Sequence, residues 1–174
     1  MDIAVVRLGH RIGRDVRTTT HVCLTARALG AKQVIVCGDN QTGLLQTVRK
    51  IVKKWGGAFK IQYSGSDRKA IKTLQKQGYC AIHATMYGQP IQTIQKKIWK
   101  KRKIAIVVGA EKVPKEIYQL ADYNVSVTNQ PHSEIAALAI ILDQLQHGKE
   151  LTKKFSKPKI KIVPSARNKK VKTR

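Results

Sequence analysis

Short runs rich in Val, Ile and Ala alternate with segments of helical periodicity along most of this chain. In the segment from Leu44 to Val52, for example, apolar residues recur at helical spacing until Gly56 and Gly57 stop the pattern. The alternation predicts an α/β domain with a largely parallel sheet, in which ligands bind beyond the carboxyl ends of the strands. The predicted strands are residues 3–8, 33–38, 58–63, 79–84, 103–109 and 123–128.

The composition changes sharply near the C-terminus. Ser133 can cap a final amphipathic helix that runs to His147, and residues 149–174 then hold eleven Lys and Arg against one acid, Glu150. We therefore expect one domain over residues 1–148 and a basic C-terminal extension over residues 149–174. Alternating charged and apolar residues favour a small β-hairpin in this extension, whereas its lysine content equally fits an RNA-binding arm that stays disordered without its partner.

The charge of the chain is strongly unbalanced, with 34 Lys and Arg against 10 Asp and Glu and a formal net charge of +24. A field of this sign attracts polyanions, and nucleic acid is the partner that it favours. No apolar run approaches the roughly 18 residues of a transmembrane helix, and the N-terminal segment lacks the layout of a signal peptide. We expect a soluble, intracellular protein without a membrane partner.

The three cysteines, Cys23, Cys37 and Cys80, form no CxxC pair and have no histidine nearby at zinc-ligand spacing. Apolar residues surround all three, which is typical of cysteines that serve as small buried side chains. We therefore expect no metal site.

Two predicted strands end in loops that could bind a ligand. In VVGAEKVP (107–114), Gly109 lets the backbone approach a ligand, and the amides of the turn could bind an adenine edge or a carboxylate. The same pattern also fits an ordinary turn into a helix. In YNVSVTNQPHSEIAAL (123–138), a polar bend leads into a helix, and it could bind a ligand through the helix amides or simply form a capped turn.

A third predicted strand ends in IHATMYGQP (82–90), where a glycine turn is expected. Met86 and Tyr87 could form an apolar slot for adenine, although a solitary Met–Tyr pair more often serves plain packing. The chain contains neither a P-loop nor a dinucleotide-binding fingerprint.

Residues 7–31 gather five arginines and two histidines around one acid, Asp15. Arginine binds phosphate through two parallel hydrogen bonds, and a positioned Arg or His could assist removal of a hydroxyl proton. We therefore predict phosphate contact for this cluster. Its basic members are Arg7, His10, Arg11, Arg14, Arg17, His21 and Arg27.

Four motifs occur in order over roughly residues 1–148: RLGHR…RDVRTTTHV…ARALGA, HATMYG, VVGAEKVP and NVSVTNQPHSEIAALA. Together they resemble the archaeal tRNA cytidine 2′-O-methyltransferases of the SPOUT superfamily. The resemblance implies a parallel sheet with helices on both faces and a deep C-terminal trefoil knot that holds S-adenosylmethionine. It also implies a cytoplasmic homodimer whose target is cytidine 56 in the T-loop of tRNA.

The resemblance further implies contacts to S-adenosylmethionine from three loops. Carried over motif by motif, these contacts are Ala84, then Gly109, Ala110, Glu111, Lys112 and Val113, then Val127, Thr128, Asn129, Gln130, Pro131, His132, Ser133 and Glu134. Related ribose methylases place an arginine one turn into the first motif helix, where this chain has Leu24. We therefore expect Arg14 or Arg17 to assist deprotonation of the 2′-hydroxyl, with His21 orienting the ribose or phosphate.

Two other functions fit part of the same pattern. A methylase of this fold could act on a base nitrogen of tRNA or rRNA, contacting the base edge instead of activating a ribose hydroxyl. A basic RNA-binding protein without chemistry would also explain the net charge and the lysine-rich extension.

Overall fold

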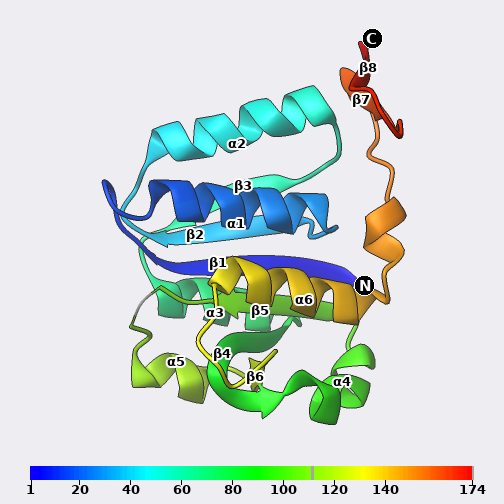
Figure 1. The fold of residues 1–174 in the computed structure, drawn as a ribbon. Helices are drawn as coiled ribbons and strands as arrows, with labels where there is room; N and C mark the ends of the chain where they lie inside the picture. The colour runs from blue at the N-terminus through cyan, green and yellow to red at the C-terminus, as the bar shows by residue number, and fades with distance from the viewer. Residues whose placement is uncertain (111, 174) are drawn as a thin grey trace.

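The computed structural model describes residues 1–110 and 112–173, and its centre is a six-stranded sheet (Figure 1). The strand order is β3-β2-β1-β5-β4-β6, and every neighbouring pair is parallel. All six predicted runs form strands, which confirms the predicted α/β domain with a largely parallel sheet. The strands are β1 (Asp2–His10), β2 (Gln33–Gly38), β3 (Lys60–Ser64), β4 (Cys80–Pro90), β5 (Lys103–Val108) and β6 (Tyr123–Ser126).

Helices cover both faces of the sheet, because the central strands are apolar on both sides. In β1, Ile3 and Val5 pack on the side of α1, α2, α4 and α6, whereas Ala4 and Val6 pack on the side of α3 and α5. In Figure 1, α1, α2 and α6 lie in front of the sheet and α3 lies behind it. The helices are α1 (Val16–Ala28), α2 (Thr42–Trp55), α3 (Asp67–Lys76), α4 (Ile91–Trp99), α5 (Lys115–Leu120) and α6 (Glu134–Gln146). None of the described helices is long and apolar enough to cross a membrane.

Strand β4 continues to Pro90, so the glycine turn predicted after residue 84 is wrong. The second part of β4 pairs with β6 after a register shift between Ala84 and Gln89. Gly88 permits this close approach, because a Cβ atom there would lie 2.5 Å from the backbone nitrogen of Val125. The sequence shows the glycine but not the neighbouring strand that requires it.

The basic extension forms a short 3₁₀ helix, η1 (Lys149–Thr152), and an antiparallel hairpin of β7 (Ile160–Val163) and β8 (Lys170–Thr173). Of the two predicted alternatives, the structure therefore contains the hairpin, which lies beside the end of α2 (Figure 1). The segment before it is tied to the domain, because Gly57 donates its N–H to the Ser156 carbonyl at 2.9 Å. Arg27 also lies over the Phe155 ring, 4.6 Å from its centre.

The cysteines are free thiols, with Cys23 and Cys37 buried and Cys80 partly buried. Burial raises the pKa of Cys23 and of Cys37 to about 12. Both thiols therefore stay protonated at neutral pH, as expected for cysteines that serve as small apolar side chains.

Candidate active site

A cavity of about 540 Å³ opens at the carboxyl ends of β1, β4 and β5, the edge at which a parallel sheet is expected to bind ligands. Its walls come from the start of α1, the end of β4, the loop after β5, helix α5 and the start of α6. The lining residues are Arg7, Arg11, Arg14, Asp15, Thr18, His83, Ala84, Thr85, Met86, Tyr87, Gly109, Ala110, Val113, Tyr118, His132, Glu134 and Ala137.

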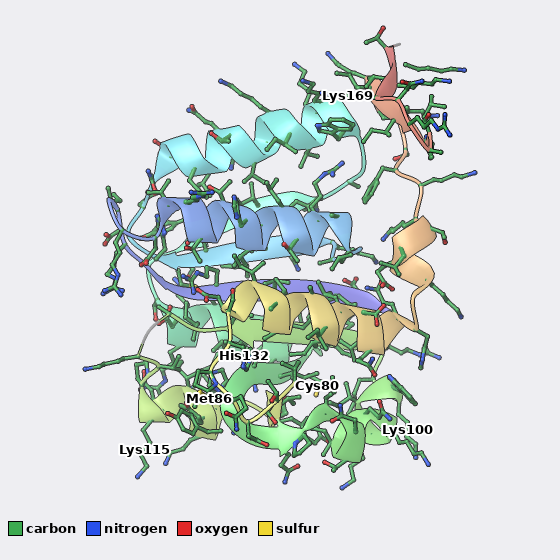
Figure 2. All side chains as sticks on the ribbon, in the orientation of Figure 1. Cys80, Met86, Lys100, Lys115, His132 and Lys169 are labelled. Carbon is green, nitrogen blue, oxygen red and sulfur yellow. The ribbon has the colours of Figure 1, made fainter. Side chains whose placement is uncertain are left out.

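This cavity brings together members of every segment that the sequence singled out. The predicted site residues that line it are Arg14, Ala84, Gly109, Ala110, Val113, His132 and Glu134. Figure 2 shows His132 of the bend near Met86 at the end of β4, although the two are far apart in the sequence. The predicted contact at Glu111 lies outside the described residues.

Other predicted residues lie outside the cavity lining. Arg17 and His21 are exposed on α1, and Lys112 instead borders a smaller cavity beside Gly9 and Asp39. Within the described part of the bend, the residues that do not line the main cavity are Val127, Thr128, Asn129, Gln130, Pro131 and Ser133.

The bend between β6 and α6 is held in place by two of its own polar side chains. Asn129 donates its amide N–H to the Met86 carbonyl at 2.6 Å, which fastens the bend to the end of β4. The Ser133 hydroxyl accepts a hydrogen bond from the Ile135 backbone N–H at 3.1 Å and caps α6. These two residues therefore shape the cavity through the backbone, and the helix N-terminus that they fix lies at its edge.

Gly109 begins the loop after β5 and has no room for a side chain. A Cβ atom there would lie 2.3 Å from Cγ2 of Val113, so the loop could not fold back as tightly with any larger residue. Because Gly109, Ala110 and Val113 all line the cavity, this tight turn presents small side chains and backbone to a ligand.

Arg7 lines the site, and the sequence had placed it in the arginine cluster without a role in holding the site together. Its guanidinium donates to Thr19 Oγ1 at 3.3 Å and to the Gly109 carbonyl, and it pairs with Glu134 Oε1 at 3.4 Å. The side chain is 1% exposed, and burial lowers the pKa of Arg7 despite the opposing effect of Glu134. Arg7 thus joins the first helix, the loop after β5 and the start of α6.

Two of the five clustered arginines, Arg7 and Arg27, are buried and use their guanidinium groups for contacts within the protein, and phosphate contact by the cluster stays a prediction. Arg27 is buried on α1 and donates to the Gly56 carbonyl at 2.7 Å while it lies over Phe155. A run of arginines in the sequence cannot show which guanidinium groups the fold will use internally.

The remaining arginines near the cavity form a basic rim. Asp15 accepts hydrogen bonds from the backbone N–H and from Nε of Arg11, both at 3.1 Å, and it lies 3.9 Å from Nε of Arg14. Burial raises the pKa of Asp15, but the hydrogen bonds and charge of Arg11 outweigh it and leave that pKa below its usual value. The side chains of Arg11 and Arg14 are 46% and 54% exposed, so both can reach a polyanion.

His83 is a second lining residue that sequence reasoning missed. It is fully buried in the first part of β4, just before the register shift that follows Ala84, and its Nδ1 lies 2.9 Å from Oδ1 of Asn124. The ring meets Tyr118 edge to face, with 4.6 Å between ring centres. Burial lowers the pKa of His83, although the hydrogen bond to Asn124 opposes this, so the imidazole is neutral at physiological pH. Its position directly before Ala84, at the end of the predicted strand 79–84, was the available signal.

The sequence of this chain matches a known family over most of its length. The model of the family described as tRNA ribose 2′-O-methyltransferase, aTrm56, matches residues 55–172. This chain belongs to that family. Within the tRNA ribose 2′-O-methyltransferases, it is 50% identical over 181 residues to the tRNA (cytidine(56)-2′-O)-methyltransferase of Methanococcus aeolicus, with 100% of both chains covered. It is also 51% identical over 168 residues to the enzyme of that name from Methanocaldococcus jannaschii, covering 95% of this chain and 93% of the relative.

Solved structures share the fold of this chain at a much lower sequence identity than these relatives. One is the SpoU methyltransferase AviRb from Streptomyces viridochromogenes in complex with AdoMet, at a TM-score of 0.57 and 13% identity. The match covers 83% of this chain and 57% of the AviRb chain. This similarity confirms the SPOUT-type α/β fold with a mostly parallel sheet. The trefoil knot implied by the sequence motifs stays a prediction.

No cluster of three or more His, Cys, Asp or Glu side chains able to hold a metal ion is found in the part of the chain that the structure describes. The expectation of metal-free chemistry stays a prediction. What the cavity offers instead is a set of cations at its rim, the start of a helix and a neutral polar wall around His83.

Proposed function

We propose that this chain methylates the ribose 2′-oxygen of cytidine 56 in the T-loop of tRNA, with S-adenosylmethionine as methyl donor. The observation that carries the proposal is that the basic rim before α1 and residues from each loop expected to bind the donor line a single cavity. Support for the target nucleotide comes from relatives of about half-identical sequence that are named for this reaction.

The volume of the cavity suits a small-molecule methyl donor such as S-adenosylmethionine. Its volume of about 540 Å³ lies within the roughly 300–1,000 Å³ usual for small-molecule sites. Gly109, Ala110 and Val113 of the loop after β5 line the cavity together with His132 and Glu134 of the bend. In the proposal, residues 109–113 and 127–134 hold the donor together with Ala84.

The donor would supply a methyl group on a positively charged sulfur. The 2′-oxygen bonds to this carbon as the carbon–sulfur bond breaks, S-adenosylhomocysteine leaves, and the proton of the 2′-hydroxyl passes to water. The task of the protein is then to align the two reactants, which can contribute roughly 7–11 kcal/mol. Arg14 is the cation best placed to lower the cost of negative charge on the 2′-oxygen, because it lines the cavity whereas Arg17 does not. Arg17 and His21, exposed on α1, would bind and orient the tRNA.

The test compares Arg14→Ala with Arg17→Ala in transfer of labelled methyl groups to unmodified tRNA. Arg14→Ala should lower kcat about 100-fold, as expected for loss of a positioned proton-transfer or charge-stabilising group. Arg17→Ala should mainly raise KM for tRNA. Wild-type turnover in both variants would refute the catalytic assignment.

Alkaline hydrolysis of the product identifies the methylated atom. A ribose methylated at its 2′-oxygen cannot attack its own phosphodiester, so the bond after cytidine 56 should survive. Complete cleavage of a methylated product would indicate a base methylase, and the absence of S-adenosylmethionine binding by calorimetry would indicate an RNA-binding protein without this chemistry.

The proposal includes the architecture implied by the family motifs. Residues 1–148 form the knotted methyltransferase domain, residues 149–174 form an extension that adds positive charge for tRNA, and two chains associate as a cytoplasmic homodimer. Outside the extension, Tyr87 and Ile140 are apolar side chains that are 76% and 45% exposed, and the proposal places them in the contact between the two chains. Sedimentation equilibrium of the purified chain should give twice the monomer mass.

A further inference from the structure

The hydrogen bonds around His83 fix which of its ring nitrogens carries the proton. Asn124 donates its Nδ2–H to the Tyr118 carbonyl at 2.9 Å, and a carbonyl can only accept. The Oδ1 atom of Asn124 therefore faces Nδ1 of His83 at 2.9 Å, and because Oδ1 is also only an acceptor, Nδ1 must be the protonated nitrogen. In the neutral ring, Nε2 is then an acceptor with a free lone pair.

Among the described residues, Nε2 of His83 is buried without a hydrogen-bond partner, although His83 lines the cavity. A buried acceptor left unsatisfied costs free energy, of which a ligand that donates to it recovers a part. One ring nitrogen is hydrogen-bonded to Asn124, whereas the other has no partner among the described residues. This difference indicates that a ligand supplies the second partner.

The two sides of the cavity differ in charge, which indicates which ligand reaches His83. The α1 side carries Arg11 and Arg14, whereas the α5 side carries His83 and Tyr118, with the Tyr118 hydroxyl 3.2 Å from Oγ1 of Thr85. Phosphates of RNA belong with the arginines. The uncharged polar wall suits the uncharged adenosyl part of the donor, which carries an amine on its base and hydroxyls on its ribose.

We propose that Nε2 of His83 accepts a hydrogen bond from an N–H or O–H group of the adenosyl moiety, so that the β4 histidine helps to select the methyl donor. This inference rests on the proposed function, since it assumes that the cavity binds S-adenosylmethionine. Asn124 is a positioning residue, because it holds the ring in the form that can accept.

Calorimetry with S-adenosylhomocysteine tests the contact without any turnover. His83→Phe keeps a flat ring beside Tyr118 but removes the acceptor, and it should weaken binding about tenfold, the usual worth of one such hydrogen bond. The matched control is His147→Phe at the end of α6, where the ring lies tilted against Trp99 with 4.4 Å between ring centres, and it should bind as the wild type does. Unchanged affinity in His83→Phe would overturn the inference, whereas failure of the wild type to bind would overturn the proposed function itself.

Ligand analogues tested on the wild type distinguish the donating group and do not depend on the folding of a variant. Replacing the adenine amine by oxygen, or removing each ribose hydroxyl in turn, should cost about tenfold for the one group that contacts His83. That loss should disappear in His83→Phe, as in a double-mutant cycle. If no analogue shows this coupling, the inference fails.

Nitrogen NMR of the wild type gives a third readout. The free protein should show His83 protonated at Nδ1, and addition of S-adenosylhomocysteine should shift the Nε2 resonance as a lone pair begins to accept a hydrogen bond. A proton on Nε2 in the free protein, or an Nε2 resonance unmoved by bound ligand, would contradict the assignment.

Discussion

Arg7 is a buried, charged side chain. Its guanidinium donates hydrogen bonds to Thr19 and Gly109 and forms an ion pair with Glu134. Arg7→Met keeps most of the side-chain volume but removes every one of these contacts and leaves Glu134 without its ion pair. We expect a loss of about 2 kcal/mol, equivalent to a fall of about 4–8 °C in the midpoint of thermal unfolding. Differential scanning calorimetry measures this directly.

The control for Arg7 is the same substitution at the rim. Arg14→Met changes a side chain that is 54% exposed and should leave the unfolding midpoint within about 1 °C. Equal midpoints for Arg7→Met and the wild type would show that the buried contacts of Arg7 do not stabilise the fold.

Glu150 is a buried carboxyl group at the start of the extension, 3% exposed. Burial raises the pKa of Glu150 above its ordinary value of 4.5, and the Asp143 carboxyl adds to this shift. Its contribution to stability is therefore complete below pH 4.5 and is lost as the pH rises through the folded-state pKa. Glu150→Gln removes this loss and offers an N–H to Asp143.

We therefore expect Glu150→Gln to unfold at a higher temperature than the wild type at pH 7, by about 2–4 °C for ~1 kcal/mol. The difference should shrink as the pH is lowered toward 4. Thermal unfolding followed by circular dichroism across this range checks the prediction, and a difference that does not vary with pH would contradict it.

At the scale of elements, a few contacts hold the C-terminal extension against α1 and the end of α2. The ring of Phe155 packs where a Cβ on Gly57 would come within 2.7 Å of it, and it also covers the guanidinium of Arg27. Phe155→Ala removes both contacts, with a cost of about 1.4 kcal/mol in the local opening of the extension. Limited trypsin digestion should then cleave the extension about tenfold faster while residues 1–148 stay intact.

The comparison for Phe155 is Leu151→Ala, which changes an apolar residue of the same extension that is 68% exposed. Trypsin should cleave the extension of the Leu151→Ala variant at the wild-type rate. Equal cleavage of both variants would mean that other contacts hold the extension.

For the whole molecule, the net charge of +24 matters through its distribution. The hairpin carries exposed Lys161, Lys170 and Lys172, and changing all three to Gln should weaken tRNA binding and lower the slope of log K against log salt by up to about 3. Filter binding across a salt series measures both quantities.

A matched set of three neutralised lysines on helix α3 distinguishes a tRNA-binding surface from the effect of net charge alone. Lys69, Lys72 and Lys76 are exposed on α3, on the opposite side of the sheet from α1. Changing these three to Gln should leave the slope nearly unchanged. If both triple variants lower the slope equally, the hairpin is not a specific tRNA surface.

The sequence by itself determined the strands, the parallel sheet and three of the segments around the cavity. Strands buried on both faces must be apolar throughout, and that local requirement is visible in runs such as residues 3–8 and 103–109. The bends after 109 and 127 were visible for a similar reason, since glycine and helix-capping residues mark places where the backbone must turn.

Only the tertiary structure decided which polar groups became the site. Arg7 and Arg14 are alike in the sequence, yet one is buried by contacts with Gly109 and Glu134 while the other stays at the rim. His83 gained its protonation pattern from Asn124 and Tyr118, residues on other elements. Burial and hydrogen-bond partners come from segments distant in the chain, so a pattern along the sequence cannot assign them.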